Sequence, residues 1–170
     1  MSVEARRAAV TVRPIAPSDI HEIRAELRSN WGSTEIWSLG HRHHADRLAG
    51  FVAEVDGAFA GLVTLAPNEG GWQCEVVTLS ARRRDAGVGT ALLERAERFA
   101  REGGFRRIYL TTTNDNTAAI RFYQRRGWRL AALHAGIVDR VREIEPDYPK
   151  TGFDGIPIRD ELELDRWFMG

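Results

Sequence analysis

The chain has 170 residues with 24 basic and 24 acidic side chains, so its formal net charge at pH 7 is zero. This length predicts a single domain over residues 1–170 with a sizeable core, and the balanced charge gives no electrostatic support for a nucleic-acid or membrane partner. Cys74 is the only cysteine, which excludes an intramolecular disulfide and favours a small core residue. Since no apolar segment has the length of a signal peptide or a membrane span, we expect a cytoplasmic protein.

Hydrophobic periodicity and turn residues predict strands and helices that alternate along most of the chain. The Asp56-Gly57 pair is a strong hairpin signal, and Gly103-Gly104 ends a helical pattern. The expected class is α/β, with a twisted mixed sheet of about six or seven strands flanked by helices. In chain order, strands are expected at residues 10–15, 51–55, 58–65, 72–79, 107–112, 129–134 and 161–167, and helices at 17–28, 88–102, 116–126 and 136–144.

A glycine-rich loop, residues 84–90 (RDAGVGT), lies between the predicted strand 72–79 and the predicted helix 88–102. Gly87 and Gly89 remove side chains where the backbone approaches another group, and they permit positive φ. The helix that follows presents unpaired amide groups and the positive end of its dipole at this point. Such a loop is suited to a phosphate or diphosphate, with which Arg84 can pair.

Two familiar glycine loops do not fit this segment. A Walker A loop needs a lysine, but Lys150 is the only lysine in the chain, and a dinucleotide fingerprint needs a third glycine that is missing after Gly89. The remaining pattern, R-x-x-G-x-G, resembles the acyl-CoA signature of the GNAT acetyltransferase superfamily. Residues 116–128 (NTAAIRFYQRRGW) resemble the second signature of that family, N-x-x-A-x-x-F-Y-x-x-x-G-[FW]. The two motifs occur in the right order, within residues 72–128.

The resemblance implies an acetyl-CoA-dependent N-acetyltransferase that transfers the acetyl group directly to a primary amine. Residues 72–128 would form the cofactor-binding core, with pantetheine paired to the backbone of the strand just before the loop. A backbone amide near Leu79 would polarise the thioester carbonyl. The implied cofactor residues are Val77, Leu79, Ala81, Arg84, Asp85, Ala86, Gly87, Val88, Gly89, Thr90, Asn116, Ala119 and Phe122.

Tyr123 and Glu75 are the candidate catalytic residues. Tyr123 matches the tyrosine of the second motif, and because a phenol is a weaker acid than a thiol we expect it mainly to donate a hydrogen bond to the leaving sulfur. The alternative for Tyr123 is a core aromatic. Glu75 is the candidate base, either directly or through water, because alternation predicts that residues 75, 77 and 79 share one face. The alternative for Glu75 is a buried ion pair.

Two long connections, residues 30–50 and 135–159, are expected to line the acceptor pocket, because acceptor specificity in the resembling family comes from such regions. A peripheral elaboration or a homodimer contact is the alternative for both. Trp31, Trp37 and His134 are the candidate acceptor-binding residues. The histidines of residues 41–44 (HRHH) favour a solvated loop, and no metal site is expected.

The acceptor itself is left open by the sequence. A small amine, an amino acid or antibiotic, a protein N-terminus and a lysine side chain all fit an amine acetyltransferase. A non-catalytic acyl-CoA-binding regulator is an alternative of another class, although Tyr123 and Glu75 argue against it. A toxin that acetylates charged tRNA is a third alternative, which the neutral composition does little to support.

Overall fold

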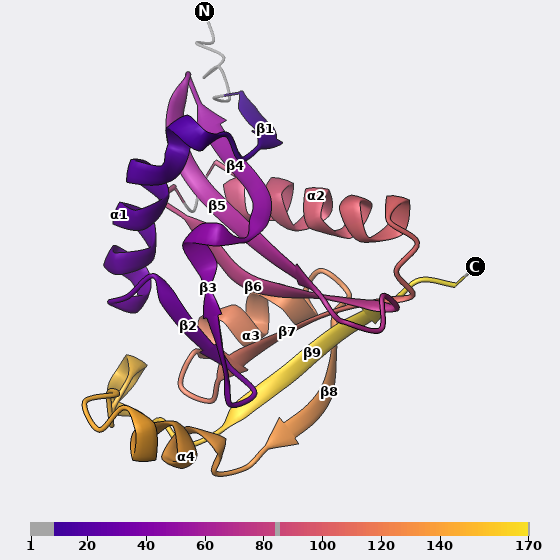
Figure 1. Cartoon of the computed structure of the whole chain (residues 1–170). Coiled ribbons are helices and arrows are strands. Elements are labelled where there is room, and N and C mark those ends of the chain that lie inside the picture. The colour runs from indigo at the N-terminus through magenta and orange to yellow at the C-terminus, as the bar shows by residue number, and fades with distance from the viewer. Residues whose placement is uncertain (1–8, 84–85, 170) are drawn as a thin grey trace, which may run out of the picture.

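A computed structural model of the chain describes residues 9–83 and 86–169. A seven-stranded sheet has the strand order β1-β4-β5-β6-β7-β9-β8, and β2 and β3 form a separate two-stranded sheet (Figure 1). The predicted α/β class and the mixed sheet are therefore confirmed. The strands are β1 (Val10–Pro14), β2 (Glu35–Ser38), β3 (His41–His44), β4 (Ala49–Val55), β5 (Ala58–Pro67), β6 (Gln73–Ala81), β7 (Arg107–Thr113), β8 (Arg129–His134) and β9 (Glu161–Trp167). The helices are α1 (Ile20–Trp31), α2 (Val88–Glu102), α3 (Thr117–Gln124) and α4 (Ile137–Ile144).

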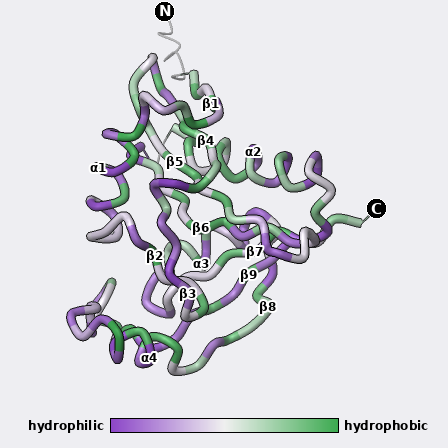
Figure 2. The backbone as a smooth tube through the Cα atoms, viewed as in Figure 1, coloured by the Kyte–Doolittle hydropathy of each residue, from purple (hydrophilic) through white to green (hydrophobic). Residues whose placement is uncertain are grey.

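Two apolar clusters hold helices against opposite faces of the large sheet (Figure 1). Leu92 and Leu93 of α2 are buried against one face. On the other face, Ile23 and Leu27 of α1 pack against buried side chains of β4 and β5. Figure 2 shows hydrophobic and hydrophilic residues interleaved along α1 and α2, as expected for helices that bury one side. Each fully buried leucine contributes roughly 1.5–3 kcal/mol to the free energy of unfolding.

The centre of the sheet opens between β6 and β7, its parallel pair. The two strands pair at only three positions, Gln73↔Arg107, Cys74↔Ile108 and Glu75↔Tyr109. Beyond these positions β6 continues beside β5 alone, and β7 continues beside β9 alone. The diverging strands thus leave facing backbone edges without a sheet partner among the described residues, and such edges can pair with an extended ligand.

A β-bulge at Val77 changes the face of the sheet to which the later side chains of β6 point. The register with β5 passes from Leu65↔Val76 to Thr64↔Thr78, so Val77 has no partner on β5. Val77 packs against the α1-side cluster, whereas Leu79 packs against the α2-side cluster. The expectation that residues 75, 77 and 79 share one face is therefore wrong, because one extra residue shifts the alternation of every residue after it.

Residues 30–50 contain a β-hairpin where the sequence favoured a loop. Glu35–Ser38 pairs with His41–His44 across a turn in which Leu39 and Gly40 have φ of 51° and 75°. Positive φ at both turn positions is the backbone shape that two-residue hairpins require. The histidine-rich strand was missed because its side chains are mostly exposed and show no alternation of polar and apolar residues.

Candidate active site

A cavity of about 170 Å³ lies where β6 and β7 diverge. Its walls come from the end of α1, from the β2 strand, from the β6 bulge, from the end of β7 and from the segment after α4. In Figure 1 the α4 segment lies beside the β2–β3 hairpin. The lining residues are Trp31, Ser33, Glu35, Ile36, Trp37, Ser38, Val77, Thr111, Thr112, Thr113, Asn116, Glu145, Tyr148 and Glu161.

Both long connections contribute to this cavity. Trp31 and Trp37, which were predicted to bind the acceptor, lie in its lining, and Glu145 and Tyr148 come from the second connection. The indole Nε1 of Trp37 is buried and has no hydrogen-bond partner among the described residues. His134 is not in the lining, because its Nε2 lies 2.8 Å from Glu163 Oε2 between neighbouring strands β8 and β9.

The glycine loop leads into α2 through a residue with positive φ, which the glycines were expected to permit. Gly87 is left-handed, with φ of 76°, and α2 begins at the next residue. A Cβ added to Gly89 would lie 3.3 Å from the ring of Phe122, so this glycine also permits close packing of α2 on α3. The predicted cofactor residues Arg84 and Asp85 lie outside the described residues.

Arg126 lies across the first turn of α2. Its Nε and Nη2 donate hydrogen bonds to Thr90 Oγ1 at 3.0 and 2.6 Å, and its guanidinium lies 3.7 Å from the ring centroid of Phe122. An arginine just after a short helix is ordinarily a solvated surface charge. The structure instead places a fixed positive charge beside the glycine loop, where it favours an anion. Sequence spacing gave no signal for this contact, because it joins the end of α3 to the start of another helix.

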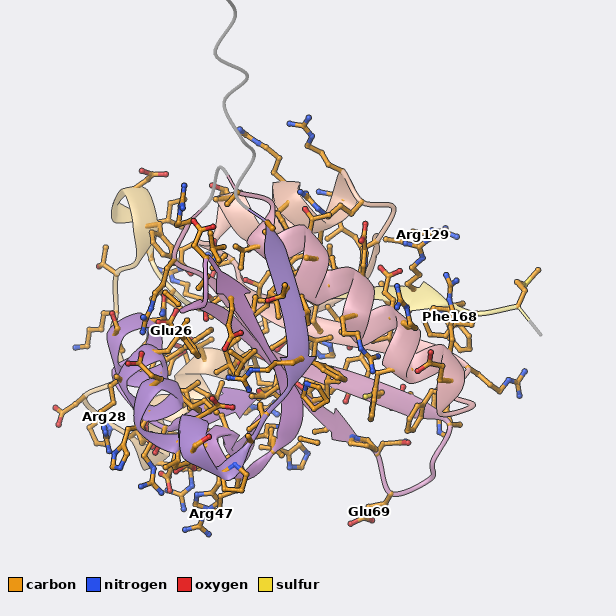
Figure 3. All side chains as sticks on the ribbon, turned by 90° about the horizontal axis from the view of Figure 1, so that it is seen from above. Glu26, Arg28, Arg47, Glu69, Arg129 and Phe168 are labelled. Atoms are coloured by element: carbon orange, nitrogen blue, oxygen red, sulfur yellow. The ribbon has the colours of Figure 1, made fainter. Side chains whose placement is uncertain are left out.

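Arg82, another basic residue near the loop, is held by α1. Its Nε donates to Glu26 Oε2 at 2.7 Å, and its guanidinium lies 4.5 Å from the ring centroid of Phe59. Glu26 is labelled on α1 in Figure 3, whereas Glu69 is labelled on the loop between β5 and β6. Arg82 therefore joins β6 to α1, and its charge is largely compensated there.

Asn116 caps α3. Its side-chain oxygen accepts a hydrogen bond of 3.1 Å from the Ala119 amide, and Asn116 also lines the cavity. The N-terminus of α3 is thereby directed toward the opening between β6 and β7. Ala119 and Phe122 pack against the α2-side core cluster.

Glu75 is buried at the last paired position of β6 and β7. Its carboxylate accepts hydrogen bonds from Ser38 Oγ and from Tyr109 Oη, the latter at 3.2 Å, and it lies 3.3 Å from His43 Nε2. Glu75 itself is not in the cavity lining, but Ser38 is, and Ser38 Oγ also lies 2.9 Å from Thr111 Oγ1. Glu75 is thus connected to the cavity through the Ser38 hydroxyl group, although it does not line the cavity itself.

Glu161 is a cavity residue that the sequence analysis missed. This first residue of β9 is only 3% exposed, it lines the cavity, and its Oε2 accepts a hydrogen bond of 2.8 Å from the Leu39 amide. Burial, together with the charge of Glu75, raises the pKa of Glu161 above its ordinary value. A carboxyl group with these properties in a cavity is a candidate base. No local pattern identifies it, because β9 reaches the cavity only by inserting between β7 and β8.

Tyr123 lies within the apolar cluster beneath α3. Its ring centroid lies 5.2 Å from that of Phe122 and 5.8 Å from that of Trp128. Burial raises the pKa of the Tyr123 phenol. The hydroxyl has no hydrogen-bond partner within the described residues, and Tyr123 is not in the cavity lining. The phenol therefore stays protonated over the ordinary pH range and retains its hydrogen for donation.

The described residues give little support for a cysteine nucleophile, a metal site or a membrane-spanning helix. Cys74 is a buried core residue, and burial raises the pKa of its thiol to about 12. No three His, Cys, Asp or Glu side chains within residues 9–83 and 86–169 are grouped so that they could hold a metal ion. No helix in these ranges has the length and apolar character needed to cross a bilayer.

Comparison with known proteins gives one family and one fold. Residues 18–128 match the acetyltransferase (GNAT) family. The uncharacterized protein YxbD of Bacillus subtilis (strain 168) is 38% identical over 149 residues, which cover 87% of this chain and 91% of that protein. A solved IAA acetyltransferase from Bacillus cereus ATCC 14579 gives a TM-score of 0.75 at 19% identity, over 94% of this chain and all (100%) of that one. A GNAT family acetyltransferase from Elizabethkingia anophelis with acetyl-CoA bound gives 0.65 at 17% identity, over 94% and 98% of the two chains.

Proposed function

Because the chain belongs to the acetyltransferase (GNAT) family, we propose that it is an N-acetyltransferase that transfers the acetyl group of acetyl-CoA directly to a primary amine. The observation that carries this proposal is the coincidence of the open edge between β6 and β7 with the cavity beside it. The edge offers backbone groups to an extended ligand, and the cavity offers room for a second ligand at the same point. The acetyl-CoA bound to a protein of the same fold supports the choice of cofactor.

The residues around the opening fit acetyl-CoA. Gly87 is left-handed and Gly89 has no side chain at the start of α2, and Arg126 adds a positive charge there. When bound, acetyl-CoA supplies an acetyl thioester that is activated toward attack by an amine. We assign its pantetheine arm to the β6 edge at Val77, Leu79 and Ala81, its diphosphate to Arg84, Asp85, Ala86, Gly87, Val88, Gly89 and Thr90, and further contacts to Asn116, Ala119 and Phe122.

The bulge supports a role for the β6 backbone in polarising the thioester carbonyl. Val77 has no β5 partner in the register and lines the cavity, so the β6 backbone at the bulge lies beside the place assigned to the thioester. Donors fixed in advance stabilise the negative charge that develops on that oxygen. We place this donor at or next to Val77, two residues before the Leu79 position that the motif alignment implied.

Glu161 and Glu75 are proposed to remove the proton of the attacking amine, Glu161 directly and Glu75 through its effect on Glu161 and Ser38. Glu161 faces the cavity and is assigned as the proton acceptor. Glu75 acts behind it: its charge raises the pKa of Glu161, and it orients the Ser38 hydroxyl in the cavity wall. Tyr123 is proposed to donate a hydrogen bond to the departing sulfur, since burial keeps its phenol protonated. The inert thiol of Cys74 supports direct transfer without an acetylated enzyme.

Calorimetry and a CoA-release assay on the full chain test the proposal. Acetyl-CoA and CoA are expected to bind, and free CoA thiol is expected to accumulate when at least one member of a panel of primary amines is added. Failure of both nucleotides to bind would refute the assignment. Tight binding without CoA release for any amine would contradict catalysis and favour an acyl-CoA-binding regulator.

A further inference from the structure

Among the described residues, the cavity has three acidic side chains and no basic one in its lining. Its described lining contains the carboxylates of Glu35, Glu145 and Glu161, and it contains no arginine, lysine or histidine. The carboxylates come from three separate parts of the fold, namely β2, the end of α4 and the start of β9. The charge is therefore a property of the assembled cavity, and it is not a local run of acidic sequence.

Two of these carboxylates form no ion pair among the described residues, although His134 acts on Glu161 electrostatically. Glu35 is compensated, since Arg42 Nη1 and His44 Nδ1 each lie 3.3 Å from its oxygens. Glu161 accepts only the Leu39 amide, at Oε2, and its Oε1 has no hydrogen-bond partner although the residue is 3% exposed. The side chain of Glu145 has no ion-pair or hydrogen-bond partner. The buried Glu161 carboxylate is destabilising in this state, whereas Glu145 is half-buried. A cation in the cavity would compensate the charge of both.

The position of Glu145 is unfavourable for its own helix. Glu145 is the C-cap residue of α4, where the helix dipole disfavours negative charge. The carboxylate and the last carbonyl groups of α4 therefore contribute negative potential on the same side. Tyr148, which lines the cavity beside Glu145, has a pKa raised by burial and by neighbouring acidic groups that include Glu161 and Glu145, whereas Arg142 acts in the opposite direction. The acidic groups around Tyr148 favour a cation at the α4 end of the cavity.

Aromatic side chains complete a cation-binding surface. Trp31, Trp37 and Tyr148 line the same cavity, and aromatic faces attract ammonium and guanidinium groups. The chain already uses two of them in this way. The Arg42 guanidinium lies 5.8 Å from the Trp37 ring centroid while it pairs with Glu35, and the Arg142 guanidinium lies 5.9 Å from the Tyr148 ring centroid. An alkyl chain has apolar wall to follow at Ile36 and Val77.

We propose that the acceptor is an aliphatic diamine or polyamine whose second cationic group is bound by Glu145 with Trp31 and Tyr148. This inference rests on the proposed N-acetyltransferase function. The amine to be acetylated lies at the Glu161 and Ser38 end, and it must lose its proton before it attacks. The second ammonium stays charged at the α4 end. The cavity volume fits a short diamine, because an apolar cavity of about 150 Å³ holds benzene, a molecule of about six heavy atoms.

A matched acceptor series tests this assignment on the full chain with saturating acetyl-CoA. The series is diaminobutane, butylamine of the same length without the second cation, and aminobutyrate, which replaces the second cation with a carboxylate. We expect kcat/KM for diaminobutane to exceed that for butylamine by about tenfold or more, and aminobutyrate to be the poorest acceptor. Equal rates for diaminobutane and butylamine, or no acetylation of diaminobutane, would overturn the inference.

A pair of variants locates the second cation. Glu145→Gln is expected to bring the ratio of kcat/KM for diaminobutane over butylamine toward one. Glu143→Gln, an exposed position on the same helix outside the cavity lining, is expected to keep the wild-type ratio. An unchanged ratio in Glu145→Gln would refute the binding place. These outcomes are distinct from failure of the proposed function, which would appear as loss of acetyl-CoA binding in calorimetry.

Discussion

Glu75 and Tyr109 face each other at the last position where β6 and β7 pair, and the Tyr109 hydroxyl donates to the Glu75 carboxylate at 3.2 Å. The hydrogen bond lies at the closed end of the opening that we assign to the cofactor. Burial and the negative charge of Glu75 both raise the pKa of Tyr109, so its hydroxyl stays protonated and continues to donate. The pair thus fixes the carboxylate that orients Ser38 in the cavity wall.

Removal of this donor is expected to reduce turnover without loss of cofactor binding. Tyr109→Phe leaves Glu75 with Ser38 and His43 as its remaining contacts, and we expect kcat to fall about tenfold because the net value of one hydrogen bond to a charged group is about 1.5–3 kcal/mol. The dissociation constant of acetyl-CoA should stay within about twofold of the wild-type value. Steady-state kinetics and calorimetry measure the two quantities.

Thr64→Val supplies the control for Tyr109→Phe. Thr64 and Thr78 share a buried hydrogen bond of 2.6 Å between β5 and β6, away from the cavity lining. The control should lower the free energy of unfolding by about 1 kcal/mol and leave kcat unchanged. A kcat for Tyr109→Phe equal to that of this control would remove the Glu75–Tyr109 pair from the mechanism.

The proposed role of Tyr123 predicts a separation of catalysis from stability. Tyr123→Phe removes a hydroxyl that has no hydrogen-bond partner among the described residues, so the melting temperature should not fall. If the hydroxyl donates to the departing sulfur, kcat should fall by about 10²-fold, as for the loss of a donor at a developing charge, while acetyl-CoA affinity is kept. Thermal denaturation and single-turnover kinetics test both statements. Unchanged turnover would leave Tyr123 as a core aromatic only.

The sequence predicted most elements because their signals are local. Helix 88–102 was predicted at the bounds that α2 has, since its apolar spacing and the Gly103-Gly104 stop lie within the segment. Strands 129–134 and 161–167 were also predicted at the bounds of β8 and β9. The predicted sheet was therefore nearly complete, and only the hairpin of β2 and β3, whose second strand is mostly exposed, was missed.

The candidate site was less predictable because it depends on contacts between distant segments. The Val77 bulge is a property of the register with β5 and cannot be seen in β6 alone. Glu161 enters the cavity through the pairing of β9 with β7, and Arg126 reaches Thr90 across two helices. Motif resemblance located the region of the cofactor, whereas the charged groups of the acceptor cavity required the assembled fold.

Gly89 is expected to be sensitive to substitution because an added Cβ would contact the Phe122 ring. Gly89→Ala places a methyl group 3.3 Å from the Phe122 ring, which is also stacked with the Arg126 guanidinium. We expect a loss of about 1 kcal/mol in unfolding free energy and a rise of about tenfold in the dissociation constant of acetyl-CoA, because the ring and the charge beside the loop must both shift. Chemical denaturation and calorimetry provide the measurements.

Gly87→Ala is the comparison for this substitution. A Cβ at Gly87 meets nothing within 4 Å, but the residue has φ of 76°. Its cost is therefore backbone strain of about 1–2 kcal/mol, without displacement of Phe122. If Gly89→Ala kept wild-type acetyl-CoA affinity, the proposed position of the diphosphate at the start of α2 would be wrong.

Glu161 is predicted to be costly for stability and necessary for activity. Because burial raises the pKa of Glu161 in the folded protein, Glu161 binds its proton more tightly when folded. The free energy of unfolding therefore falls as the pH rises from the pKa of this residue in the unfolded chain, about 4.3, through its higher pKa in the folded protein. Glu161→Gln removes this dependence, so the variant should gain stability relative to wild type above that range.

As a base, the carboxyl must be ionised, so wild-type kcat/KM should fall as the pH drops through the raised pKa. Glu161→Gln should lose about 10²-fold in kcat/KM near neutral pH and lose this acid limb, whereas Glu161→Asp should retain the limb at a lower rate. Denaturation curves and pH-rate profiles of the three proteins decide the matter, and an acid limb that persists unchanged in Glu161→Gln would assign the proton to another group.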